Sequence, residues 1–289
     1  MLTIGIFPNI SKKNVGSVID WMVGYCKKKK IAILLPEQTA KVLNYPDLSG
    51  TIEFMKDHID VAITLGGDGT LLSTIRKIAP SGIPAFGINM GQLGFLTQAE
   101  LSQAECALEK IIHGDYCVEK RVMLDALVVR NSKNIYVSSA VNDVVVTKAG
   151  FSRMIKLRLL VGGEPAADYW ADGLIAATPT GSTGYSLSAG GPIVNPELDV
   201  MLLTPICPHT LHARPMIISA DEEVTINLPI AQEDIVLTVD GQVIQKLLPG
   251  DEVRVRRSAS QAQFLRFNDK SYYRSLRLKL WRDDLHANV

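Results

Sequence analysis

The sequence predicts an α/β domain followed by a β-rich domain and a final helix. Up to Ile112, short apolar runs typical of buried strands alternate with amphipathic helical repeats, the pattern of a parallel sheet covered by helices. From Tyr116 onward, strand-like runs are separated by turns and show few helical repeats. Tyr272 to Trp281 regains a helical spacing, so we expect this segment to cross back to the first domain. The predicted domains are residues 1–119 with 263–289, and 120–262.

The composition is that of an ordinary enzyme. The chain has 289 residues, 47% hydrophobic and 21% charged, and its 30 basic residues balance its 30 acidic ones, so net charge gives no reason to expect a nucleic-acid partner. We expect a cytoplasmic protein without a membrane partner, because no run is long enough to span a membrane and no signal-peptide pattern is present. His209 and His212 lack a third ligand nearby, so we predict no metal site built by the protein. The scattered cysteines predict neither disulfides nor a zinc site: Cys26, Cys106, Cys117 and Cys207.

Apolar periodicity places the elements of both domains. In the first domain we expect strands at 3–7, 31–35, 61–65 and 83–88, and helices at 14–26, 52–58, 102–112 and from near Thr70. In the second we expect strands at 123–129, 135–146, 155–161, 174–177, 216–219, 223–228, 235–239, 242–247 and 252–256. Asp240-Gly241 lies between two of these runs and predicts a hairpin turn.

The loop Gly66-Gly67-Asp68-Gly69-Thr70 follows a buried strand and opens a helix. Glycines let backbone N–H groups approach a ligand, and the helix start attracts anions, so the loop suits a phosphate. It has neither the lysine of a Walker A loop nor the third glycine of a dinucleotide fingerprint. A carboxylate here would repel phosphate unless it holds a cation or accepts a proton from a hydroxyl, which indicates phosphoryl transfer. The alternative is that Asp68 only caps the helix.

Two further segments are rich in small and polar residues. Asn89 to Thr97 forms a second glycine-rich loop after a strand, and two such loops can face one cleft. Asp172 to Pro192 ends a strand in a run of hydroxyls and glycines. Hydroxyl groups both donate and accept hydrogen bonds, so this run can line a nucleotide, and Tyr185 could lie against a base.

Taken together, these segments resemble the ATP-dependent NAD kinases, which are related to phosphofructokinases and diacylglycerol kinases. The resemblance spans nearly the whole chain, and the hydroxyl-rich segment is its most specific part. The matching motifs are Gly66-Gly67-Asp68-Gly69-Thr70, Gly91-Gln92-Leu93-Gly94-Phe95, Asn142-Asp143, Asp172-Gly173 with Thr178 to Ser188, and Val239-Asp240-Gly241-Gln242.

The resemblance implies a phosphofructokinase-like α/β domain, a β-sandwich domain, a terminal helix returning to the first domain, and a homodimer or homotetramer. It implies transfer of the ATP γ-phosphoryl group to the 2′-hydroxyl of the adenosine ribose of NAD, with Mg²⁺ or another divalent cation accompanying ATP. By similarity Asp68 is the general base. The nucleotide-binding residues expected are Gly66, Gly67, Gly69, Thr70, Phe95, Asn142, Asp143, Arg153, Trp170, Asp172, Thr183, Gly184, Tyr185, Ser186, Leu187, Ser188 and Gln242.

Among these residues, similarity gives several a specific place on the dinucleotide. Asn142 and Asp143 belong on the adenosine part, Asp172 on the nicotinamide amide, and the segment from Thr183 to Ser188 along the molecule. Phe95 would border the adenine. Arg153 and Gln242 would complete the pocket.

Three positions depart from the family pattern, and two other functions stay open. The family usually has Glu at Asp143, Ala at Gly184 and often Arg at Trp170. We hypothesise that the Trp170 ring borders the nicotinamide; the alternative is that it packs between strands. One alternative function is a lipid or sphingoid kinase with the same glycine loop. The other is a non-catalytic sensor of NAD or NADP, against which the presence of Asp68 argues.

Overall fold

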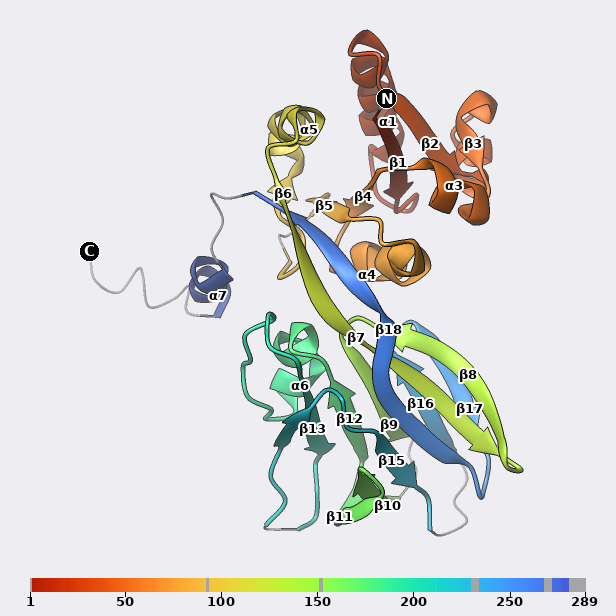
Figure 1. Ribbon diagram of the computed structural model, residues 1–289, viewed down its shortest axis with the longest axis vertical. Coiled ribbons are helices and arrows are strands. Elements are labelled where there is room, and N and C mark those ends of the chain that lie inside the picture. Colours follow the sequence, from red (N-terminus) through yellow and green to blue (C-terminus); the bar gives the residue numbers. More distant parts are fainter. Residues whose placement is uncertain are drawn as a thin grey trace, which may run out of the picture. The chain divides into compact units, whose positions relative to one another are not determined.

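The computed structural model describes residues 2–91, 94–150, 153–210, 212–229, 234–267 and 272–280. The chain forms two compact units, Met1–Lys120 with Gln263–Val289, and Arg121–Ala262 (Figure 1). Strands β7 (Cys117–Arg130) and β18 (Glu252–Arg266) carry the chain from one unit into the other. Within the described residues, no helix is both long enough and apolar enough to cross a membrane.

The first unit is built on a parallel sheet, as predicted. Its strands lie in the order β5-β4-β1-β2-β3, and every pairing along this order is parallel. All residues of β4 are buried, which is typical of a parallel strand covered on both faces. The strands are β1 (Thr3–Pro8), β2 (Ala32–Pro36), β3 (Ser49–Gly50), β4 (Val61–Gly66), β5 (Ala85–Asn89) and β6 (Ala99–Glu100), which pairs with β5.

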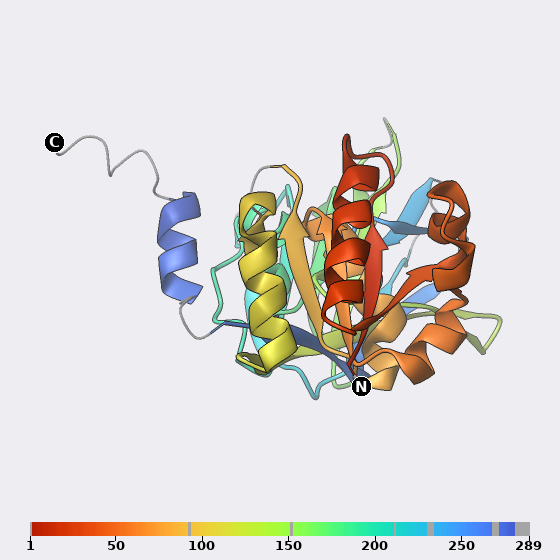
Figure 2. The same ribbon diagram turned by 90° about the horizontal axis from the view of Figure 1, so that it is seen from above.

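Helices cover both faces of this sheet. Ile4 and Ile6 share a buried cluster with α1 and α5, which lie side by side (Figure 2). The alternate residue, Gly5, faces Met55 of α3 on the opposite face. The helices are α1 (Val15–Lys28), α2 (Glu37–Val42), α3 (Ile52–His58), α4 (Asp68–Ile78), α5 (Ala104–His113) and α7 (Tyr272–Leu280), with short 3₁₀ turns at Pro46–Leu48, Ala79–Ser81 and Leu101–Gln103.

The expected boundary of α4 was wrong by two residues. The helix begins at Asp68 rather than near Thr70, and Gly67 takes the N-cap position. No side chain caps this helix, so the alternative role of Asp68 as a capping residue does not hold. The carboxylate is drawn away from its own helix by hydrogen bonds to another loop, described below.

The second unit consists of two antiparallel sheets. One has the order β14-β13-β12-β9-β16-β17, and the other places β11, β10, β15 and β18 side by side, with the β7–β8 hairpin joined to β18. Its strands besides β7 and β18 are β8 (Lys133–Ala140), β9 (Asp143–Lys148), β10 (Ile155–Val161), β11 (Glu164–Ala171), β12 (Gly173–Ala177), β13 (Val200–Ile206), β14 (Met216–Ser219), β15 (Val224–Asn227), β16 (Ile235–Val239) and β17 (Val243–Leu247). Two short helices, η4 (Thr180–Thr183) and α6 (Tyr185–Ser188), follow β12.

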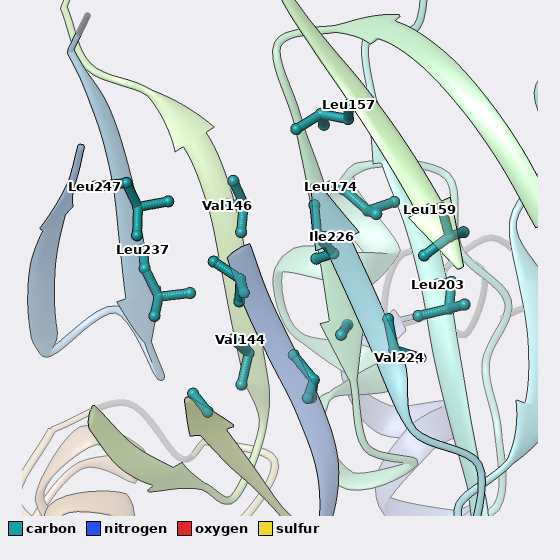
Figure 3. Packing of buried hydrophobic residues seen from close by; sticks show 14 of the residues in the cluster. Val144, Val146, Leu157, Leu159, Leu174, Leu203, Val224, Ile226, Leu237 and Leu247 are labelled. Carbon is teal, nitrogen blue, oxygen red and sulfur yellow. The ribbon is translucent and has the colours of Figure 1, made fainter. Parts of the chain in front are cut away.

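The core of the second unit lies between these two sheets (Figure 3). Val144 and Val146 on β9 and Leu237 on β16 come from one sheet, and they share a single buried cluster with Leu157 on β10 and Ile226 on β15 from the other. Along β10 and β16, residues of this cluster alternate with less buried ones, as expected for strands that turn one face to the core of a sandwich. The predicted β-sandwich is therefore confirmed.

Several expected elements differ from the structure. The single strand expected at 135–146 is two strands, because the chain bends at Val141 and Asn142 between β8 and β9. Helix α2 and strands β11 and β13 were not anticipated. The final helix forms as α7, while Trp281, Gln92 and Leu93 lie outside the described residues.

Candidate active site

Asp68 is the most heavily hydrogen-bonded side chain of the first unit's glycine loops. Its Oδ2 accepts the backbone N–H groups of Phe95 at 2.7 Å and Leu96 at 3.2 Å. Its Oδ1 accepts both the N–H group at 2.9 Å and the hydroxyl at 3.1 Å of Thr97. A carboxylate offers about four acceptor positions, so this loop orients Asp68 completely. The two glycine-rich loops predicted from sequence therefore meet at this one carboxylate.

Thr97 and Asn89 support this arrangement, and sequence reasoning missed both. The Thr97 hydroxyl oxygen accepts the N–H of Gly94 at 3.2 Å and the Asn89 amide at 3.1 Å while donating to Asp68. Asn89 ends β5 and is buried, and its Oδ1 accepts the N–H of Gly91 at 2.6 Å. A polar residue ending a fully buried strand was the available signal.

Close approach of the two loops depends on glycine. A Cβ atom at Gly94 would overlap the Asp68 carboxyl group. A Cβ at Gly91 would meet its nearest neighbour, Asn89 Oδ1, at an ordinary 3.7 Å. The absence of a side chain at Gly94 is therefore what lets the Phe95 to Thr97 segment reach Asp68.

In the second unit, Asp240 organises the turn that carries Asn142 and Asp143. Its carboxylate accepts three successive backbone N–H groups, from Val141 at 3.1 Å, Asn142 at 2.7 Å and Asp143 at 3.1 Å. Asp240 and Gly241 both have positive φ in the predicted hairpin between β16 and β17, which is confirmed. Sequence reasoning gave Asp240 this turn role and a place in a family motif, but did not include its carboxylate among the site residues.

Asp143 is the neighbouring carboxyl group without such partners. It is only 6% exposed, and no side-chain hydrogen bond or ion pair to it occurs among the described residues. Burial, and secondly the charge of Asp240, raise the pKa of Asp143 to about 7. Three N–H groups point at the Asp240 carboxylate, whereas none in the described part of the chain points at the Asp143 carboxyl.

The hydroxyl-rich segment divides into structural and accessible groups. The hydroxyls of Thr178, Ser182 and Ser186 are buried and bond within the protein, to Val141 C=O, Pro179 C=O and the Thr204 hydroxyl. Thr183 and Leu187 are partly buried, and Tyr185 and Ser188 are exposed. Gly184 brings its backbone close to Asp143, since a Cβ there would lie 3.9 Å from Asp143 Oδ2.

The structure brings Tyr185, Asp172 and Asp143 near one another. Burial raises the pKa of the Tyr185 hydroxyl, with further contributions from Cys207, Asp172 and Asp143. Asp172 also forms an ion pair with Lys148, Nζ to Oδ1 2.7 Å, a partner that sequence reasoning missed. Lys148 is the last residue of β9.

The remaining predicted residues lie at exposed or loop positions. Trp170 is 44% exposed on β11, which is more than a ring packed between strands would be. Arg153 and Gln242 are exposed. The Phe95 ring is partly buried beneath the Lys279 ammonium of α7, 4.8 Å from the ring centroid.

Models of two protein domains match the chain: the ATP-NAD kinase N-terminal domain over residues 23–116 and the ATP-NAD kinase C-terminal domain over residues 141–267. The chain belongs to the NAD kinase family. It is 41% identical over 280 residues to an NAD kinase from Natranaerobius thermophilus, covering 97% of this chain and 98% of that one. An NAD kinase from Heliobacterium modesticaldum is 43% identical over 281 residues, with 97% and 99% covered.

Solved structures agree with this assignment. A yeast NADH kinase complexed with NADH superposes with a TM-score of 0.88 at 25% identity, covering 98% of this chain and 88% of that one. An NAD kinase from Archaeoglobus fulgidus in complex with ATP gives a TM-score of 0.75 at 25% identity, with 95% and 97% covered. The chain is thus an ATP-dependent kinase of this family, and none of these relatives supports a lipid kinase.

Gly94→Ala should lower kcat by about 10²-fold, because the new Cβ displaces the loop that orients Asp68, and small misplacements near the reacting atoms are costly. Gly91→Ala is the matched control, because its Cβ meets only ordinary contacts. Steady-state kinetics of both variants check this expectation. Equal kcat values for the two variants would contradict it.

The stability of the protein should depend on pH through Asp143. Its carboxyl binds a proton more tightly in the folded than in the unfolded chain, so its contribution is largest below about pH 4 and is lost as pH rises to about 7. The free energy of unfolding should fall by at most ~1.4 kcal/mol per pH unit across this window. Asp143→Asn should lack this loss. Urea unfolding at pH 5 and pH 8 checks this, and a pH-independent difference between variant and wild type would contradict it.

Tyr185→Ala should weaken NAD binding by about 5- to 100-fold, the range expected for loss of an aromatic ring stacked on a base. Stability should change little, because the side chain is 46% exposed. Calorimetric titration with NAD and thermal unfolding test the two parts separately. Tyr136→Ala, which removes another exposed tyrosine of the same unit, is the control. Unfolding of Tyr185→Ala with unchanged affinity in the folded fraction would show that the ring is only structural.

Proposed function

We propose that Asp68 is the general base that activates the 2′-hydroxyl of the adenosine ribose of NAD for attack on the γ-phosphorus of ATP. The supporting observation is the set of three backbone N–H groups and one hydroxyl that orients this carboxylate at the end of β4. An acceptor held in a single orientation suits proton transfer, which requires the two oxygens to lie within hydrogen-bond distance.

The substrate hydroxyl must take one of the four acceptor positions of Asp68. The Thr97 hydroxyl can release its position most easily, because its hydrogen rotates and its N–H still holds Oδ1 at 2.9 Å. As the oxygen–phosphorus bond forms and the bond from the γ-phosphorus to the bridging oxygen breaks, the ribose proton passes to Asp68. ADP leaves with the bonding electrons, and NADP is the second product.

We assign dinucleotide binding to the second unit. Asn142 and Asp143 follow a turn held by Asp240, and the Asn142 Oδ1 is buried without a hydrogen-bond partner among the described residues. A buried acceptor without a partner is costly, and a ribose hydroxyl or an adenine amino group would satisfy it. The accessible residues Thr183, Tyr185 and Ser188 then lie along the ligand, and Asp172 contacts the nicotinamide amide.

A divalent cation, in our proposal Mg²⁺, enters with ATP. The described residues contain no cluster of three or more His, Cys, Asp or Glu side chains that could hold a metal ion. Mg²⁺ commonly keeps several waters and binds through substrate phosphates with few protein carboxylates, so a loop with Asp68 as its single acidic residue fits this mode. The cation would neutralise charge on the transferred phosphoryl group.

A homodimer or homotetramer and a cytoplasmic location stay predictions. The first rests on the family resemblance, and the second on the sequence patterns described above.

Asp68→Asn should lower kcat by about 10²–10⁴-fold, the usual contribution of a positioned proton acceptor, because the amide cannot accept the proton. The amide also loses an acceptor for a backbone N–H, so stability should fall as well. Asp240→Asn loses the same kind of hydrogen bond but should mainly raise KM for NAD, since it supports the dinucleotide segment. A coupled assay with NAD, ATP and Mg²⁺ measures both effects. Near-normal kcat in Asp68→Asn would refute the assignment, and wild-type protein that binds NAD without turnover would indicate a sensor.

A further inference from the structure

Lys279 on α7 contacts Phe95, one of the residues that donate hydrogen bonds to the Asp68 carboxylate. Its ammonium group is 4.8 Å from the centroid of the Phe95 ring. The N–H of Phe95 donates to Asp68 Oδ2 at 2.7 Å, the shortest of the four hydrogen bonds to this carboxylate. A cation from the last helix of the first unit therefore contacts the segment that orients the proposed base.

The helix presents this lysine inward. Leu276 is the buried residue of α7, and Lys279 follows it by three positions, so both lie on the same helix face. Lys279 is partly buried, whereas the intervening Arg277 and Leu278 are exposed. Ordering a long charged side chain against the protein has an entropic cost, which the face of an aromatic ring offsets through its quadrupole.

Within the segment from Gly94 to Thr97, Phe95 offers the side chain that a cation can contact. Leu96 and Thr97 are buried, with 5% and 3% exposure, and Gly94 has no side chain. The Phe95 ring is partly exposed. Lys279 covers the ring at the point where the segment begins its N–H contacts with Asp68, so the two interactions share one residue.

We propose that Lys279 is a positioning residue for phosphoryl transfer: by holding the Phe95 ring it keeps the N–H groups of Phe95, Leu96 and Thr97 on the Asp68 carboxylate. This inference rests on the proposed role of Asp68. Lys279 acts through Phe95, so its loss reduces the fraction of molecules in which the base is correctly oriented. In this role Lys279 acts on the Asp68 loop rather than on a substrate, so the expected effect is on kcat.

Lys279→Met keeps the length and apolar stem of the side chain but removes the charge. It should lower kcat by about two- to tenfold, the range that a partly buried cation–π contact supports, while KM for ATP and for NAD changes less than twofold. Lys279→Arg keeps a cation that stacks on aromatic rings and should restore kcat. An increase in KM for ATP at unchanged kcat would mean that Lys279 binds phosphate directly, and this result would overturn the proposal. An increase in KM for NAD alone would overturn it too.

The first unit supplies a matched control. Lys110 on α5 lies over the ring of Phe267, also 4.8 Å from the centroid, and Phe267 is not part of the loop that holds Asp68. Lys110→Met removes an equivalent cation–π contact, so its effect on thermal stability should match that of Lys279→Met. Its kcat should equal that of the wild type. An equal loss of kcat in both lysine variants would show a general stability effect and overturn the proposal.

Double-mutant cycles test the route from Lys279 to Asp68. In a Phe95→Leu background, Lys279→Met should have no further effect on kcat, because the ring that it holds is gone. The same should be true in an Asp68→Asn background. Additive effects in either cycle would overturn the proposal. If Asp68→Asn alone keeps normal kcat, the proposed base is wrong; if it loses activity while Lys279→Met does not, only the positioning role fails.

Discussion

The structure depends on one kind of interaction used twice: an aspartate accepts three successive backbone N–H groups from a loop that is distant in sequence. Asp68 does this to the segment Phe95 to Thr97, and Asp240 does it to Val141 to Asp143. Neighbouring N–H groups that converge on one point form a concave site for an anion. Here the anion is a side chain of the protein itself, so each loop keeps its shape without a ligand. Asp68, which we assign to catalysis, and Asn142 and Asp143, which we assign to dinucleotide binding, take part in these two interactions.

Local sequence patterns were sufficient to predict those helices and strands whose extent is marked by their own residues. The helix Ile52–His58 and the strands Ile155–Val161 and Ile235–Val239 formed where expected, because apolar periodicity and turn residues mark their ends. The bend at Val141 and Asn142 could not be predicted, since it is imposed by Asp240, 98 positions from Asn142. The role of Thr97 was missed for the same reason, because its partner Asp68 is 29 positions away. Residue types identified the candidate loops, whereas contacts over long sequence separation decide which atoms meet.

The hydroxyl-rich segment shows why composition alone overestimates the number of residues that can contact a ligand. Thr178, Ser182 and Ser186 were part of one polar run with Tyr185 and Ser188, yet the first three bond inside the protein. A tight chain path after β12 leaves buried backbone groups that these hydroxyls satisfy, as where Ser182 accepts the N–H of Val194. Part of the run therefore builds the platform, and the rest remains accessible on it.

The second unit is inserted within the first, and this order has a consequence for synthesis of the protein on the ribosome. All of Arg121–Ala262 can emerge and fold before the first unit has its last strand segment. Ala85 of β5 can pair with Phe264 only after Phe264 has been synthesised. The adjacent core is complete only once Leu265 and Phe267 have followed. Lys279 emerges later still. A nascent chain should therefore acquire a folded second unit early, while the Asp68 loop reaches its final form only near the end of translation, so that premature release yields a protein able to hold ligand but slow in turnover.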